Sequence, residues 1–229
     1  MRIQSKITEE VLRLARNQEQ NEKMREERKE QILVEALHQF ATKGLFATKI
    51  KDIAEAVGMA QGLIYHYYKS KDEIYVELIK NALDKMNTAV FMLQEMPLPP
   101  HEKIRMAIEK LLQTIESNDD FTQTCRLISQ ATNSTAIPEN AKKLIEEKRD
   151  IPYQEIAKIM ADGQKEGTII NADPNELAVI FWTSINGLAI YKATRQDSIA
   201  MPDARILINL FLKENNYRTK DMSKDENKE

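Results

Sequence analysis

The sequence is poor in the features of disulfide-linked, membrane-spanning and sheet-forming proteins. Its 229 residues include one cysteine, Cys125, which excludes a disulfide within the chain. No apolar run approaches the roughly 18 residues of a membrane-spanning helix, and the first residues lack the apolar segment of a secretory signal. Glycine is scarce, alternating Val/Ile/Thr runs are absent, and strong helix formers dominate. We therefore expect an all-α protein in the cytoplasm.

Patterns of catalytic and metal-binding residues are also scarce. The chain has 3 histidines, of which His38 follows Glu35 with the Glu-x-x-His spacing of helical di-iron proteins. Such a site needs a second Glu-x-x-His motif, and neither His66 nor His101 supplies it. No glycine-rich phosphate-binding loop is present. We expect no enzyme activity, no cofactor and no metal site.

The charge is distributed unevenly along the chain. The formal net charge is −3, but residues 1–71 contain 13 Lys or Arg against 10 Asp or Glu, whereas residues 72–229 contain 20 against 26. A basic N-terminal part beside an acidic remainder suits contact with a polyanion at one end of the protein. Chance scatter explains the charge asymmetry equally well when charge is considered alone.

A helix-turn-helix is predicted around Gly58. Residues 28–43 have the apolar periodicity of a helix, which Gly44 ends in a left-handed conformation. Thr48 offers an N-cap for a short second helix that Gly58 closes. A third helical segment, residues 61–68, follows after only two residues. Two short helices joined by a tight glycine-containing turn are typical of a helix-turn-helix.

The chain is predicted to have four parts. Residues 1–27 form a polar N-terminal arm or helical extension, and residues 28–72 form the three-helix DNA-binding domain. Residues 73–217 form a larger helical domain for ligand binding and dimerisation, whose last helix is expected at about 202–215. Residues 218–229 are a polar tail that we expect to be disordered.

Residues near the third helical segment combine the side chains that suit a DNA surface. The second helix of a helix-turn-helix lies in the major groove, and flanking groups contact phosphates. Ile64 and Tyr68 share one helical face and should pack inward. Tyr65 and Tyr67 cannot both lie on that face. For His66, contact with phosphate and simple exposure to solvent are equal alternatives. The residues predicted to contact DNA are Thr48, Gln61, Gly62, Leu63, Tyr65, His66, Tyr67, Lys69 and Lys71.

A family resemblance rests on the stretch ILVEALHQFATKGLFATKIKDIAEAVGMAQGLIYHYYKSKDEI. Its shared features are Phe40 four residues before Gly44, Thr48 ahead of the Ile53–Ala54 pair, Gly58, and Tyr65-x-x-Tyr68-x-x-Lys71. This stretch resembles the N-terminal domain of the TetR family of bacterial transcriptional regulators. The resemblance implies phosphate contacts from Thr48, Tyr67 and Lys71 and groove contacts from Gln61, Leu63 and Tyr65. Ala60 and Leu63 depart from the hydroxyl residues common in that family.

The later helices carry more apolar surface than one buried face requires. Residues 175–194 are apolar on two sides, and the run ILINLFL near the end of the chain is similar. We therefore expect a homodimer joined by a four-helix bundle, as the resemblance also implies; a helix buried within a monomer is the alternative. The predicted interface residues are Leu177, Phe181, Leu188, Ile206, Leu210 and Phe211.

A small-molecule effector is expected to bind among the middle helices. The candidate pocket residues are Phe121, Cys125, Tyr153, Met160, Trp182 and Asn186, most of which suit a core position equally well. The predicted function is a ligand-responsive regulator, a repressor by resemblance, that binds a palindromic operator as a homodimer and is released by its ligand. The alternative is a helical protein-interaction module that does not bind DNA.

Overall fold

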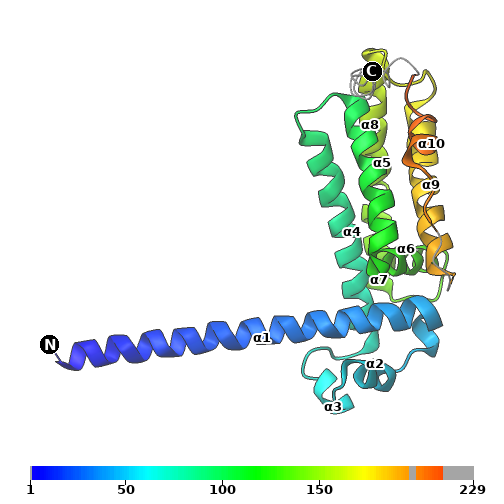
Figure 1. Ribbon diagram of the computed structural model, residues 1–229. Helices are drawn as coiled ribbons and strands as arrows, with labels where there is room; N and C mark the ends of the chain where they lie inside the picture. Colours follow the sequence, from blue (N-terminus) through cyan, green and yellow to red (C-terminus); the bar gives the residue numbers. More distant parts are fainter. Residues whose placement is uncertain (1, 196–199, 214–229) are drawn as a thin grey trace, which may run out of the picture. The chain divides into compact units, whose positions relative to one another are not determined.

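A computed structural model describes residues 2–195 and 200–213, with the side chains of residues 2–17 and 19 left undescribed. The fold is all-α, as expected (Figure 1). The chain divides into two compact units, Met1–Leu78 and Ile79–Glu229. This division falls six residues after the boundary expected at residue 72, and it lies within α4 (Lys71–Glu95). The tail at 218–229 lies outside the described residues.

The first unit is built on one long helix, α1 (Arg2–Ala47), which Gly44 interrupts with a φ of +81°. Residues 2–27 continue the helix of residues 28–43 without a break and therefore form a helical extension (Figure 1). Below residue 28 the described side chains are exposed. The helix of residues 28–43 instead buries an apolar face, which includes Ile32, Ala36 and Phe40.

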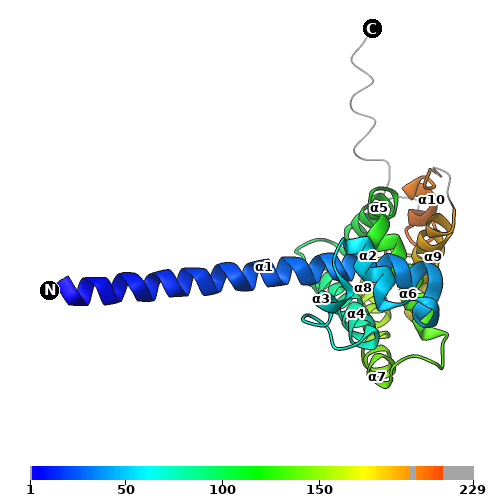
Figure 2. The same ribbon diagram turned by 90° about the horizontal axis from the view of Figure 1, so that it is seen from below.

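Two short helices follow α1. They are α2 (Ile50–Val57) and α3 (Gln61–Ile64), and α2 packs beside α1 in both views (Figures 1 and 2). Gly58 ends α2 with a φ of +74°, and the next amide, of Met59, donates to the carbonyl of Ala54 at 2.8 Å. The positive φ predicted for Gly44 and the helix end predicted at Gly58 are therefore confirmed, since glycine adopts a positive φ without a steric penalty.

In the second unit, the described residues form the rest of α4 and six further helices. These are α5 (Pro100–Ser117), α6 (Asp119–Thr132), α7 (Glu139–Lys148), α8 (Ile151–Lys165), α9 (Pro174–Ala193) and α10 (Ala204–Ile208). In its core α9 packs against α8 and α6, and α10 packs against α5 (Figure 2). Asp173 caps α9 by accepting a hydrogen bond from the amide of Asn175, and Pro174 occupies its first turn.

The last helix is shorter than the 202–215 expected from the sequence. After α10 the chain pairs with the segment that follows α8, through an isolated antiparallel bridge between Ile169 and Leu212. The amide of Ile170 donates to the carbonyl of Phe211 at 2.9 Å. Phe211 and Leu212 are both buried. The apolar run therefore folds partly as extended chain, which hydropathy alone does not distinguish from a buried helix.

The pairing segment also sits tightly against α8 at Gly163. A Cβ atom added to Gly163 would lie 2.4 Å from Cδ1 and 2.6 Å from Cγ1 of Ile169, whose side chain is fully buried. Glycine is therefore required here for close approach, because a methyl group has no space in the core.

Replacement of Gly163 by alanine is expected to lower the free energy of unfolding by about 1–3 kcal/mol, because Ile169 must shift out of its packed position. Urea denaturation followed by circular dichroism measures this change. The matched control is Asp162→Ala, which removes only an exposed ion pair with Lys165 and should change stability by about 0.5 kcal/mol or less. Equal stability of Gly163→Ala and wild type would contradict the close packing.

Candidate nucleic-acid interface

The segment from α3 to α4 divides its side chains between the core and the solvent. Ile64 and Tyr68 are buried, as predicted, with 0% and 1% of their surfaces exposed. Leu63 and Tyr65 are 47% and 50% exposed. Beyond Ile64 the chain continues in tight turns rather than as the α-helix expected to residue 68. The inward residues fix the segment on α1 and α2, and the outward ones remain available for contact.

The outward side chains form one polar and aromatic surface. Its members with exposed side chains are Gln61, Leu63, Tyr65, His66 and Lys69, together with Gly62 and the half-buried Tyr67. These are seven of the nine residues predicted to contact DNA. The next helix is capped beside them, because Ser70 Oγ accepts a hydrogen bond from the amide of Glu73 at 3.2 Å. The carboxylate of Glu73 reaches back to the amide of Lys69, at 2.6 Å. The cap holds this surface at the start of α4.

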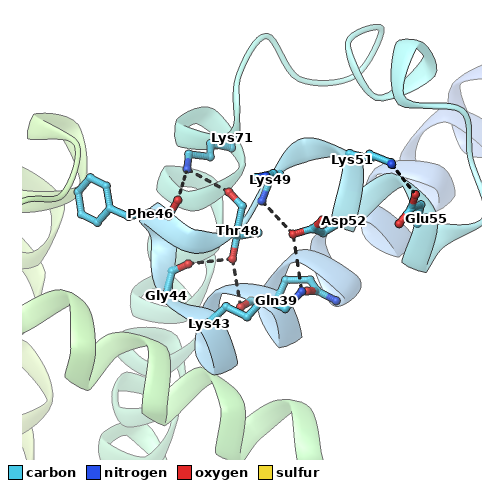
Figure 3. Close-up of polar contacts among 10 residues, drawn as sticks. All are labelled: Gln39, Lys43, Gly44, Phe46, Thr48, Lys49, Lys51, Asp52, Glu55 and Lys71. Carbon is cyan, nitrogen blue, oxygen red and sulfur yellow. Dashed lines mark hydrogen bonds and ion pairs between the residues drawn. The ribbon is translucent and has the colours of Figure 1, made fainter.

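Thr48 is not part of this exposed surface, contrary to the prediction. Its side chain is buried, and its hydroxyl donates to the carbonyl oxygens of Gly44 at 2.8 Å and Gln39 at 3.2 Å (Figure 3). The N-cap position of α2 belongs instead to Lys49, whose amide donates to the Asp52 carboxylate at 3.3 Å. The Thr48 side chain therefore stabilises the end of α1 and is too buried to contact phosphate.

Lys71 is also a structural residue rather than a free cation. Its ammonium group donates to three backbone carbonyls, those of Leu45 at 2.7 Å, Phe46 at 3.2 Å and Thr48 at 3.0 Å. Figure 3 shows the contacts with Phe46 and Thr48. An ammonium group has three N–H donors, so these contacts use all of them. The expected phosphate contact of Lys71 is wrong for this geometry, because the side chain points into the loop between α1 and α2.

Tyr68 completes the inner side of the site. The Lys29 ammonium lies 5.4 Å from the centre of its ring, a distance typical of a cation–π contact. Burial, followed by the nearby carboxylate of Glu77, raises the pKa of Tyr68 far above the usual value. The ring therefore stays neutral and acts as packing between α1 and α4.

Sequence reasoning did not single out Arg25 and Arg28, which the structure places beside this surface. Both are exposed, and with His66 and Tyr67 they line one cleft. The signal that would have found them is the helical spacing that joins them to the buried Ile32.

The predicted pocket residues in the second unit largely belong to its core. Met160 and Trp182 are buried, and Phe121, Cys125 and Tyr153 pack against the same cluster, whereas the half-buried Asn186 lies outside it. The indole N–H of Trp182 donates to the carbonyl of Pro152 at 3.0 Å. Burial raises the pKa of the Cys125 thiol to about 12, so it stays protonated at neutral pH.

The predicted dimer residues separate into two groups. Leu177, Phe181 and Phe211 are buried in the core of their own unit, so their assignment to an interface between chains is wrong. Ile206 and Leu210 are exposed, and Leu188 is half-buried. The apolar outer face of α9 instead carries residues at helical spacing that the prediction omitted, namely Val179, Ile180, Thr183, Gly187 and Tyr191. We call these five residues the α9 stripe.

Two other kinds of site are absent from the described residues. No helix there is both long and apolar enough to cross a membrane. No group of three or more His, Cys, Asp or Glu side chains in that part of the chain is arranged to hold a metal ion.

Substitution of Lys71 by methionine is expected to lower the free energy of unfolding by about 1–2 kcal/mol, because three loop carbonyls lose a charged donor. Chemical denaturation and amide hydrogen exchange of residues 45–50 measure the effect. Lys69→Met is the matched control, since the Lys69 side chain is exposed, and it should leave both measurements unchanged. If Lys71→Met is as stable as the wild type but binds DNA more weakly, the result would support the predicted contact between Lys71 and phosphate.

The comparisons with known proteins agree with this geometry. The family described as "Bacterial regulatory proteins, tetR family" matches residues 32–78. The HTH-type transcriptional repressor KstR2 of Mycolicibacterium smegmatis is 30% identical over 89 residues, which cover 39% of this chain and 43% of that protein. The HTH-type transcriptional activator FasR of the same organism is 27% identical over 112 residues, 49% of this chain and 50% of FasR. The matched stretch thus spans about half the length of these two relatives.

The likeness of the fold extends further than the sequence identity. The solved structure of the ketosteroid transcriptional regulator KstR2 of Mycobacterium tuberculosis aligns with a TM-score of 0.67 at 19% identity, covering 82% of this chain and 96% of that one. These relatives are regulators rather than enzymes. Residues 32–78 therefore match the TetR family of bacterial regulatory proteins, and the helical architecture of the chain is similar to that of a solved regulator.

Proposed function

We propose that the chain is a DNA-binding transcriptional regulator that acts as a homodimer on a palindromic operator. The observation that carries the proposal is the outward surface of residues 61–69 on a helix-turn-helix whose inner side chains are locked. In this proposal α3 enters the major groove. Gln61, Leu63 and Tyr65 contact base edges, and His66, Tyr67 and Lys69 contact the phosphate backbone. Thr48 and Lys71 hold the loop behind that surface.

Gln61 is the side chain with the most specific chemistry for a base edge. Its amide can pair with the N6 and N7 atoms of adenine through two hydrogen bonds. The Gln61 side chain is exposed in the first turn of α3, where a recognition helix makes its base contacts.

Replacement of Gln61 by alanine is expected to cost about 1–3 kcal/mol of discrimination at one base pair, because alanine cannot form the two hydrogen bonds to the base. The operator is first selected from a random duplex library, and fluorescence anisotropy then compares it with a scrambled duplex. Gln113→Ala removes an exposed glutamine of α5 and serves as the control. If the wild type enriches no duplex and its binding to DNA does not change with salt, the protein-interaction alternative is favoured. DNA binding through phosphates would weaken steeply with salt.

The α9 stripe supports the homodimer. Val179 and Ile180 are 48% and 44% exposed. Among the described residues, no atom beyond its own helix lies within 4 Å of a Cβ placed on Gly187, so another backbone can approach closely there. The exposed Ile206 of α10 and Leu210, which follows that helix, add apolar surface in the same unit. An apolar helix face of this kind is suited to pairing with its own copy across a twofold axis.

Replacement of Ile180 by glutamate is expected to shift the chain from dimer to monomer, because a charge would be buried at the centre of the pairing face. Sedimentation velocity measures the change. Met92→Glu, at an exposed position of α4, is the control and should leave the dimer intact. A wild type that is monomeric at micromolar concentration would contradict the proposed pairing.

A small-molecule effector is proposed to bind the second unit and release the operator. The solved structure of AibR in complex with isovaleryl coenzyme A and operator DNA is similar in fold to this chain, and this likeness supports the same kind of response here. The helix α4 starts at the Lys71 contacts and continues into the second unit, so it provides a covalent route between them. A ligand that binds the released conformation about 100-fold more tightly than the DNA-bound conformation favours release by about 2.7 kcal/mol.

Repression is the proposed direction of control. KstR2 is named a repressor and FasR an activator, so the relatives by themselves support either direction. The resemblance to the TetR family favours repression. An operator that overlaps a promoter would be blocked by the bound dimer and freed by the effector.

A further inference from the structure

The N-terminal extension of α1 carries a cationic face beside the site. Asn21, Met24, Arg25 and Arg28 occupy positions i, i+3, i+4 and i+7, so they lie on one face of the helix. The same helix is anchored four residues later by the fully buried Ile32. Its rotation is therefore fixed by the core, and with it the direction of this face.

This face borders an open cleft of about 510 Å³. Its lining consists of Asn21, Met24, Arg25, Arg28, His66 and Tyr67 and contains no acidic residue. The volume far exceeds the roughly 30 Å³ of one water molecule, so the cleft has room for a larger group. Arg28 and Arg25 supply cations on one side, and His66 and Tyr67 supply hydrogen-bonding tips on the other.

The two arginines differ in their surroundings. The Arg28 guanidinium donates to the side-chain oxygen of Gln31 at 2.8 Å, which orients it and leaves further N–H groups for another acceptor. Arg28 also borders a neighbouring groove that includes acidic residues such as Glu27 and Glu30, a groove to which Arg25 does not contribute. Arg25 is therefore the cation more fully committed to the cleft.

We propose that this cleft holds a phosphodiester of the DNA backbone, which Arg25 and Arg28 contact from α1 and His66 and Tyr67 contact from the segment after α3. Guanidinium groups match the geometry of phosphate oxygens and pair with them through charge-assisted hydrogen bonds. The cleft contains Tyr67, two residues beyond the exposed Tyr65. The extension of α1 thereby lengthens the DNA contact beyond the helix-turn-helix. This inference rests on the proposed function.

The test is the double substitution Arg25→Gln and Arg28→Gln in the full chain, assayed by anisotropy on the selected operator across a series of salt concentrations. Affinity is expected to fall about tenfold, and the log–log salt slope to become shallower by about 0.9 for each phosphate that the variant no longer neutralises. Hydroxyl-radical footprinting should show weaker protection at the outer edge of the site. Arg25→Gln alone should produce more of this effect than Arg28→Gln alone.

A control of equal charge separates the cleft from general attraction. Lys23→Gln with Lys165→Gln also removes two exposed cations, but Lys23 lies on the opposite side of α1 from Arg25. An equal fall in affinity in this control would overturn the proposal. Circular dichroism and thermal melting are expected to be unchanged for both double variants, since all four side chains are exposed.

The remaining outcomes distinguish the inference from the function beneath it. If the wild type binds the operator and Arg25→Gln/Arg28→Gln binds with the same affinity and slope, only the cleft contact is disproved. If the wild type enriches no duplex, the proposed function fails first and the cleft contact with it. Binding of inorganic phosphate that is seen in the wild type and lost in the variant, while both bind the operator with equal affinity, would assign the cleft to a small anion instead.

Discussion

The ammonium group of Lys71 fixes the geometry of the loop between α1 and α2. Three carbonyl oxygens converge on it, from Leu45, Phe46 and Thr48. These groups leave the regular hydrogen bonding of α1 at the left-handed Gly44, and backbone carbonyls without partners are costly where water is scarce. One side chain from the first residue of α4 satisfies them together. The direction in which α2 and α3 leave α1 therefore depends on a residue near the far end of the domain.

The aromatic and basic cluster of residues 65–71 thus contains two kinds of side chain. Tyr68 and Lys71 stabilise the domain from within, by packing and by hydrogen bonds to backbone oxygen. Tyr65, His66 and Lys69 point outward and belong to the surface that we propose contacts DNA. A cluster of this composition suggests DNA contact as a whole, but only some of its members can provide it.

The sequence predicted those features that depend on local backbone and periodicity. Gly44 was expected to be left-handed, Gly58 was expected to close the second helix, and Ile64 was expected to face inward, because such positions follow from helical spacing and steric limits. The role of Lys71 depends on carbonyls more than twenty residues earlier in the chain, which no local pattern encodes. In α9 both faces are apolar, so periodicity could not decide that Phe181 faces its own core and Ile180 the solvent.

Because α1 runs unbroken from its extension into the core, the direction in which Arg25 points depends on the number of residues between it and Ile32. Each residue of a helix adds about 100° of rotation and about 1.5 Å of rise. Deletion of a single residue between Arg28 and Ile32 would swing Arg25 away from Tyr67 without altering either side chain, whereas insertion of seven residues there would restore nearly the original angle. Relatives of this chain with a longer or shorter junction would then need to differ by whole helical turns. Only such differences keep the cationic residues on the side of the helix that faces residues 66–67.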